Sequence, residues 1–204
     1  MQWRTTMKNP AAGIDKKAYL QKIVRSEINP PIVSIVGKSG SGKTTLLEKL
    51  VAELKQRDFR VGTIKHDVHG FEMDRPGKDS WRHKQAGAAT TIISSPYQIG
   101  MVRDVDHDHQ PEELMPFLSD VDVILTEGYK QGSWPKLEIF RSEIHRSPLC
   151  RSDDNLLALA SDDLLDLDVP RFATDDVKGL VDLLIKHFNL DQTTSVLQIQ
   201  CEMN

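Results

Sequence analysis

The residue pattern best suited to chemistry is a glycine-rich loop at positions 37–44, which reads Gly-Lys-Ser-Gly-Ser-Gly-Lys-Thr. It follows an apolar run at 32–36 and precedes a stretch with helical periodicity. Glycines allow a tight turn that points several backbone N–H groups at one phosphate. The loop therefore predicts a nucleoside triphosphate site that also uses Mg²⁺. The alternative is a simple Gly/Ser turn between a strand and a helix.

Within this loop, Lys43 would contact the β- and γ-phosphates and the Thr44 hydroxyl would bind Mg²⁺. Lys43 is accordingly also a catalytic candidate. The dipole of the following helix would add favourable charge at the same place. We expect nucleotide contacts from the loop and from the residue after it: Gly37, Lys38, Ser39, Gly40, Ser41, Gly42, Lys43, Thr44 and Thr45.

A phosphate loop needs a carboxylate at the end of a neighbouring strand, to hold Mg²⁺ or its waters. Glu127 ends the mostly apolar run 121–126 and precedes Gly128. Asp122 lies at the other end of this run, about 17 Å away at the usual rise of a strand. We therefore predict that Glu127, and not Asp122, is the second metal residue. A surface carboxylate at a strand end is the alternative.

A polar loop at 66–78 lies close in sequence to the expected site. A loop of this length in a small domain is usually functional or mobile. Asp67 or Asp79 could orient the attacking water or a metal-bound water, and Lys78 and Arg75 could neutralise phosphate. The alternative for each is a solvated loop residue, or for Asp79 the N-cap of a short helix.

Composition excludes several classes of function. The chain has 204 residues and a net charge of −4, which argues against a basic nucleic-acid-binding surface. Two cysteines without a Cys-x-x-Cys pair do not form a disulfide framework, and the histidines lack zinc spacing. There is no apolar run of about 18 residues. We expect a cytoplasmic protein without a membrane partner or a dedicated transition-metal site.

Strand-like and helix-like patterns alternate from residue 32 onward. Strands are predicted at 32–36, 59–65, 121–126, 137–141, 156–160 and 169–173, and a β-hairpin at 88–95 and 97–103. Helices are predicted after the loop to about 57, from about 79 to 87, from 111, and at 175–188. This is an α/β phosphate-loop NTPase fold, a mostly parallel twisted sheet with helices on both faces and a hairpin insertion. The predicted domains are an N-terminal extension at 1–30, a nucleotide-binding domain at 31–189 and a C-terminal tail at 190–204.

Several further motifs together resemble one family. They are Ile-Lys-His-Asp at 64–67, Asp-Arg-Pro-Gly-Lys-Asp-Ser-Trp at 74–81, Asp-Val-Ile-Leu-Thr-Glu-Gly-Tyr-Lys at 122–130 and Ala-Leu-Ala-Ser-Asp at 158–162. With the phosphate loop, they resemble the molybdopterin-guanine dinucleotide biosynthesis adapter protein B family. The resemblance covers about residues 32–188. It implies a homodimeric GTP-binding protein with weak GTPase activity that acts beside the guanylyltransferase joining GMP to molybdopterin.

The usual guanine motif, Asn-Lys-x-Asp, is missing, so the preference for GTP rests on the resemblance. Ser161 and Asp162 are candidates for contacting the base, although the pair could instead cap a turn. The resemblance to dimerising phosphate-loop ATPases also raises the possibility that Lys38 crosses to a partner's nucleotide, but we favour a solvent-facing lysine.

Two other functions remain open. One is a phosphate-loop kinase of a small metabolite, with Arg75 and Arg82 as lid residues. The other is a nucleotide-gated binding module with negligible turnover.

Overall fold

The structure, a computed structural model, describes residues 29–191. Two compact units make up this part of the chain. One contains residues 29–66 and 111–191, and the other contains 67–110. The predicted extension at 1–30 and tail at 190–204 lie almost wholly outside the described residues. None of the helices within 29–191 is long and apolar enough to cross a membrane.

The first unit is built on a six-stranded sheet. Its strands are β1 (Ile32–Val36), β2 (Val61–Lys65), β5 (Val123–Glu127), β6 (Lys136–Ile139), β7 (Leu156–Ala160) and β8 (Arg171–Phe172). Every pair of neighbours is parallel, in the order β2-β5-β1-β6-β7-β8. Strands β5 and β2 lie on one side of β1, and β6, β7 and β8 lie on the other, so the strand order reverses at β1. In open α/β sheets, ligands bind at the carboxyl ends of the strands where the order reverses.

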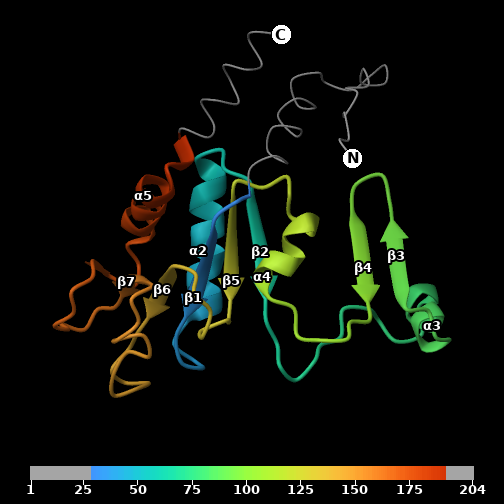
Figure 1. Cartoon of the computed structure of the whole chain (residues 1–204), viewed down its shortest axis with the longest axis horizontal. Coiled ribbons are helices and arrows are strands. Elements are labelled where there is room, and N and C mark those ends of the chain that lie inside the picture. The colour runs from blue at the N-terminus through green and yellow to red at the C-terminus, as the bar shows by residue number, and fades with distance from the viewer. Residues whose placement is uncertain (1–28, 192–204) are drawn as a thin grey trace, which may run out of the picture. The chain divides into compact units, whose positions relative to one another are not determined.

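Helices cover both faces of this sheet, as predicted (Figure 1). Helices α2 (Lys43–Gln56) and α5 (Val177–Phe188) pack on one face, where Leu46, Leu50 and Leu184 meet alternate residues of the central strands. Helix α4 (Pro111–Leu114) and the 3-10 turn η1 (Met115–Phe117) pack on the other face, around Ile32 and Ile124. Burial on both faces explains why the central strands β1 and β5 are mostly apolar on both of their faces.

The second unit contains helix α3 (Asp79–Gln85) and the strands β3 (Thr90–Ser94) and β4 (Ile99–Arg103). The two strands pair antiparallel, which confirms the predicted hairpin. Helix α3 lies against β3. The Lys84 ammonium joins the two open ends of the hairpin by bonding to the Ala88 carbonyl before β3 and the Asp104 carboxylate after β4.

Some predicted boundaries were wrong. The N-cap of α3 is Lys78 in extended backbone and not Asp79, which lies inside the first turn. The strand predicted at 137–141 ends at Ile139, which leaves Arg141 in a loop. The strand predicted at 169–173 has two paired residues, because it pairs with β7 alone at the sheet edge.

Candidate functional site

The phosphate loop connects the carboxyl end of β1 to the amino end of α2. Gly37 and Gly42 have φ values of +148° and +100°, which only glycine adopts readily. Gly42 is the N-cap of α2, and no acidic residue lies in the first turn of this helix. The N–H groups and dipole of the helix therefore favour an anion at this point.

Within the loop, the Lys38 carbonyl oxygen accepts two hydrogen bonds that hold the loop together. It accepts from the Ser41 N–H at 3.1 Å and from the Lys43 ammonium at 3.0 Å. An ammonium has three donors, so Lys43 can keep this bond and still reach a phosphate. Ser41 is buried, and its hydroxyl oxygen has no hydrogen-bond partner among the described residues. Exposed positions at the mouth of the loop are Lys38, Ser39, Gly40, Thr44 and Thr45.

The two predicted metal residues lie in direct contact. The Thr44 hydroxyl donates to Oε1 of Glu127 at 2.9 Å. Glu127 ends β5, and it is in register with Ile35 of β1 and with Lys65 of β2. Two adjacent ligands of an octahedral Mg²⁺ ion, each about 2.1 Å from it, lie about 3.0 Å apart. The spacing of these two oxygens therefore fits Mg²⁺.

Asp122 precedes the same strand at its opposite end. Its carboxylate accepts the Arg60 N–H at 2.7 Å, and its own N–H donates to the Arg60 carbonyl at 2.7 Å. Asp122 is buried, and it bonds the backbone of Arg60 through both its carboxylate and its N–H. Its position favours a structural role and supports the preference for Glu127.

Ser161 and Asp162 follow β7, two strands away from the phosphate loop. Ser161 is fully buried, and its hydroxyl accepts the Asp163 N–H at 3.1 Å, so it serves the local turn. The exposed Asp162 carboxylate accepts the N–H of Thr174 at 2.9 Å and its hydroxyl at 2.6 Å. These two bonds, helped by the nearby Arg141 and Arg171 charges, lower the pKa of Asp162 below its ordinary value. Asp162 is therefore an ionised acceptor at neutral pH.

The sequence analysis did not identify two hydrogen bonds in the first unit, one at the phosphate loop and one below it. Arg141 donates from Nε to the Ser41 carbonyl of the phosphate loop at 3.2 Å. Below the loop, the buried Thr126 hydroxyl donates to the Ser34 hydroxyl at 3.0 Å and so ties β5 to β1. The polar residues inside apolar strands were the sequence signal for the second contact. The first had no local signal.

The other two catalytic candidates belong to the second unit. The Asp67 carboxylate accepts the His69 N–H at 3.0 Å, which closes a local turn. Asp79 lies 3.8 Å from Arg82 on the exposed side of α3. Their catalytic assignment stays a prediction.

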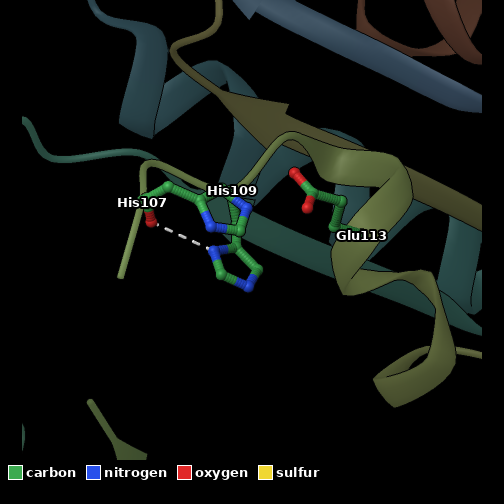
Figure 2. A group of neighbouring side chains, drawn as sticks. All are labelled: His107, His109 and Glu113. Atoms are coloured by element: carbon green, nitrogen blue, oxygen red, sulfur yellow. Dashed lines mark hydrogen bonds between the residues drawn. The ribbon is translucent and has the colours of Figure 1, made fainter. Parts of the chain in front are cut away.

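Two histidines of the second unit stack on one another. The rings of His107 and His109 have centroids 4.1 Å apart, and His109 Nδ1 donates to the His107 carbonyl at 3.1 Å (Figure 2). Glu113, also labelled there, belongs to helix α4 of the first unit. The Asp106 carboxylate bonds the His107 ring, which lowers the pKa of Asp106.

A parallel sheet in this order, with a glycine-rich loop between β1 and a helix, defines the fold of a phosphate-loop NTPase. Within that class the chain belongs to the molybdopterin guanine dinucleotide synthesis protein B family, whose model matches residues 32–162.

Curated relatives match over most of their length. The chain is 38% identical to the molybdopterin-guanine dinucleotide biosynthesis adapter protein of Escherichia coli, over 76% of this chain and 92% of the relative. It is 34% identical to the protein of the same name in Haemophilus influenzae, over 82% and 97%. The crystal structure of Bacillus subtilis MobB superposes with a TM-score of 0.62 at 28% identity, covering 76% of this chain and 96% of that one. These matches confirm the family and the fold predicted from the sequence.

Proposed function

We propose that this protein is a GTP-binding adapter of molybdopterin-guanine dinucleotide biosynthesis, with slow Mg²⁺-dependent GTPase activity. The adapter name of the curated relatives supports the first part of this proposal, and the glycine-rich loop before α2 supports nucleotide binding. In this role the protein would act in the cytoplasm as a homodimer, beside the guanylyltransferase that joins GMP to molybdopterin.

The observation that carries the nucleotide proposal is the 2.9 Å contact between Thr44 and Glu127. It joins the loop to a carboxylate 83 positions away, with the oxygen spacing that Mg²⁺ requires. A bound Mg²⁺ ion would neutralise charge on the phosphate oxygens. Lys43 and the amino end of α2 would hold the phosphates against the loop.

Slow turnover fits the charges that the site supplies. Lys43 is its cation toward the β- and γ-phosphates, and phosphate-loop proteins without an additional transition-state cation hydrolyse GTP at roughly 10⁻⁴ to 10⁻³ s⁻¹. Asp67 and Asp79 remain the candidates for orienting the attacking water. A turnover above about 10 s⁻¹, in the range of kinases, would contradict the adapter proposal.

Asp162 is the better candidate of its pair for selecting guanine. A carboxylate accepts about four hydrogen bonds, and Thr174 supplies two of them. The remaining capacity suits the two donor groups on the Watson–Crick edge of guanine, N1–H and the 2-amino group. Adenine presents an acceptor at N1 and would be repelled.

The second unit offers a surface for assembly. On the β3-β4 hairpin, Ile92 pairs with Met101 and Ser94 pairs with Ile99, so Ile92, Met101 and Ile99 lie on one face. Ile92 is 61% exposed and Ile99 is 74% exposed. A hairpin alone is marginally stable, and apolar patches of this kind mark interaction sites. A symmetric dimer would cover them.

The central test is calorimetric titration with GTP and ATP, with and without Mg²⁺. We expect Mg²⁺-dependent binding that prefers GTP. Replacing Lys43 by alanine should weaken triphosphate binding at least about tenfold, since a charge-assisted bond contributes about 1.5–3 kcal/mol. Asp162→Ala should abolish the preference for GTP over ITP, which lacks the 2-amino group, whereas Asp166→Ala, an exposed control, should not. Equal affinity for GTP and ATP in the wild type would refute the guanine assignment.

The adapter and dimer proposals need separate measurements. Light scattering after size exclusion should give twice the chain mass for the wild type and one chain mass for an Ile92→Lys/Ile99→Lys variant. Addition of the wild type to purified guanylyltransferase should increase dinucleotide formation, whereas the Lys43→Ala protein should not. Phosphate transfer to a small metabolite, in place of phosphate release, would favour a kinase.

A further inference from the structure

Arg141 lies between the phosphate loop and the segment that follows β7. It stands two residues beyond the end of β6, and its Nε donates to the Ser41 carbonyl at 3.2 Å. Nη1 lies 3.8 Å from the Glu143 carboxylate, and the Arg141 side chain is 39% exposed. Nη2 has no partner within residues 29–191. The guanidinium therefore touches the loop while part of it still faces solvent.

Hydrogen bonds hold the backbone from Arg141 onward. The Ser142 N–H and hydroxyl both donate to the Asp163 carboxylate, at 2.8 and 2.7 Å. The Arg141 carbonyl accepts the N–H groups of Ile144 and His145, at 3.0 and 3.1 Å. Such bonds hold the start of the side chain in place, so less conformational entropy is lost when its far end binds a ligand.

The order of strands places Arg141 on the path of a nucleotide. Strand β6 lies between β1, which ends at the phosphate loop, and β7, which ends at Asp162. Neighbouring strands are about 4.8 Å apart, so the ends of β1 and β7 are about 10 Å apart. A nucleotide with its β-phosphate in the loop and its base at Asp162 must carry its ribose and α-phosphate across the end of β6.

The positive charge of Arg141 is consistent with a position between the phosphate loop and Asp162. After the two Thr174 hydrogen bonds, the positive charge of Arg141 also contributes to the lowered pKa of Asp162. Arg141 therefore acts electrostatically on the candidate base-contacting residue while it bonds the phosphate loop. A planar guanidinium is well suited to phosphate oxygens, since its donors are arranged as a fork.

We propose that Arg141 binds the α-phosphate of the bound guanine nucleotide while it holds the Ser41 carbonyl. The assignment rests on the proposed GTP site and adds to it a residue from outside the glycine-rich loop. Glu143, whose side chain is 73% exposed, would give up its ion pair with Arg141 to the phosphate.

The test compares the dissociation constants of GTP and GDP for the wild type and the Arg141→Ala, Arg141→Gln and Arg141→Lys proteins. Loss of a charged contact to phosphate should weaken binding about tenfold. The α-phosphate is common to both nucleotides, so Arg141→Ala should weaken GTP and GDP by the same factor. Lys43→Ala should weaken GTP more than GDP. Arg146→Ala, an exposed arginine in the same loop, should bind both nucleotides as the wild type does.

The glutamine variant separates binding from support of the loop. Glutamine keeps a neutral N–H donor for the Ser41 carbonyl but no charge, so Arg141→Gln should lose affinity almost as Arg141→Ala does, and Arg141→Lys should recover part of it. Wild-type affinity in Arg141→Gln would overturn the phosphate contact. A defect with GTP that disappears with 2′-deoxy-GTP would also overturn it, because the contact would then be to the ribose. If the wild type binds neither GTP nor GDP with Mg²⁺, the proposed function itself fails.

Discussion

Gly37 is the loop position where the structure most clearly forbids a side chain. Its φ of +148° is unfavourable for any other residue. A Cβ atom there would lie 2.6 Å from the Ile139 carbonyl oxygen and 2.7 Å from the Ser41 hydroxyl oxygen. Gly40 provides the matched control, since it also has a positive φ of +80° but would place a Cβ with nothing within 4 Å. Replacing each by alanine separates backbone strain from overlap.

The expected cost follows from these contacts. An alanine held in the left-handed region costs about 1–2 kcal/mol, which applies to Gly40→Ala, and the φ of Gly37 costs an alanine at least as much. Only Gly37→Ala adds overlap with a strand carbonyl, which costs about 1–3 kcal/mol when neighbours must shift. The free energy of unfolding should therefore be lower for Gly37→Ala than for Gly40→Ala by about 1–3 kcal/mol. With a urea dependence of about 1–3 kcal/mol per molar, their midpoints should differ by about 1 M.

Urea unfolding followed by far-ultraviolet circular dichroism measures this difference directly. Gly37→Ala should also bind GTP more weakly than the wild type, because relief of the overlap moves Ser41 and the N–H groups beside it. Equal midpoints for the two alanine variants would refute the reasoning. Wild-type GTP affinity in a destabilised Gly37→Ala protein would show that the loop does not need this backbone for binding.

Three further predictions concern other parts of the first unit. Glu127→Gln should raise the Mg²⁺ concentration needed for GTP binding about tenfold or more in a metal titration, whereas Asp122→Asn should leave it unchanged. Burial is the main reason that the pKa of Cys150 is raised from 9.0 to about 11, so the folded thiol stays protonated where the unfolded one ionises. The free energy of unfolding should therefore fall between about pH 9 and pH 11, by up to about 2–3 kcal/mol. Urea titrations at the two pH values should show this loss for the wild type and not for the Cys150→Ala protein. Lys38→Ala should hydrolyse GTP at the wild-type rate if this exposed lysine faces solvent; a slow variant rescued by mixing with Lys43→Ala protein would establish a role across the dimer.

The geometry around the candidate phosphate and metal residues could be predicted from the sequence because most of the information is local. Residues 37–44 are contiguous, and the turn and helix start follow from glycine and the motif spacing. Glu127 required one further rule, that parallel strands end at the same edge of a sheet. The registers of Ile35 and Lys65 with Glu127 bear out that rule.

The role of Arg141 could not be predicted from the sequence, because its contact with the phosphate loop is not local. Its partner Ser41 is 100 positions away, and the contact exists only because β6 pairs with β1 on the side opposite β5. Apolar patterning does not determine which side of β1 a later strand takes. The prediction also extended the strand to residue 141, which would have assigned Arg141 to a β-ladder. The error at Asp79 was smaller: an acidic residue is favourable both at the N-cap and in the first turn, so composition does not separate the two positions.

The same strand order explains why the glycine-rich loop leaves the base undetermined. The candidate phosphate and metal residues lie at the ends of β1 and β5, which are direct neighbours. The candidate base contact comes from the end of β7, two strands from β1 on the other side. Phosphate is the same in every nucleotide, so residues 37–44 and Glu127 carry no information about the base. If the protein binds GTP as proposed, we expect selection for guanine to come from the segment after β7, where Thr174 anchors the Asp162 carboxylate, with Arg141 at the strand end between the two regions.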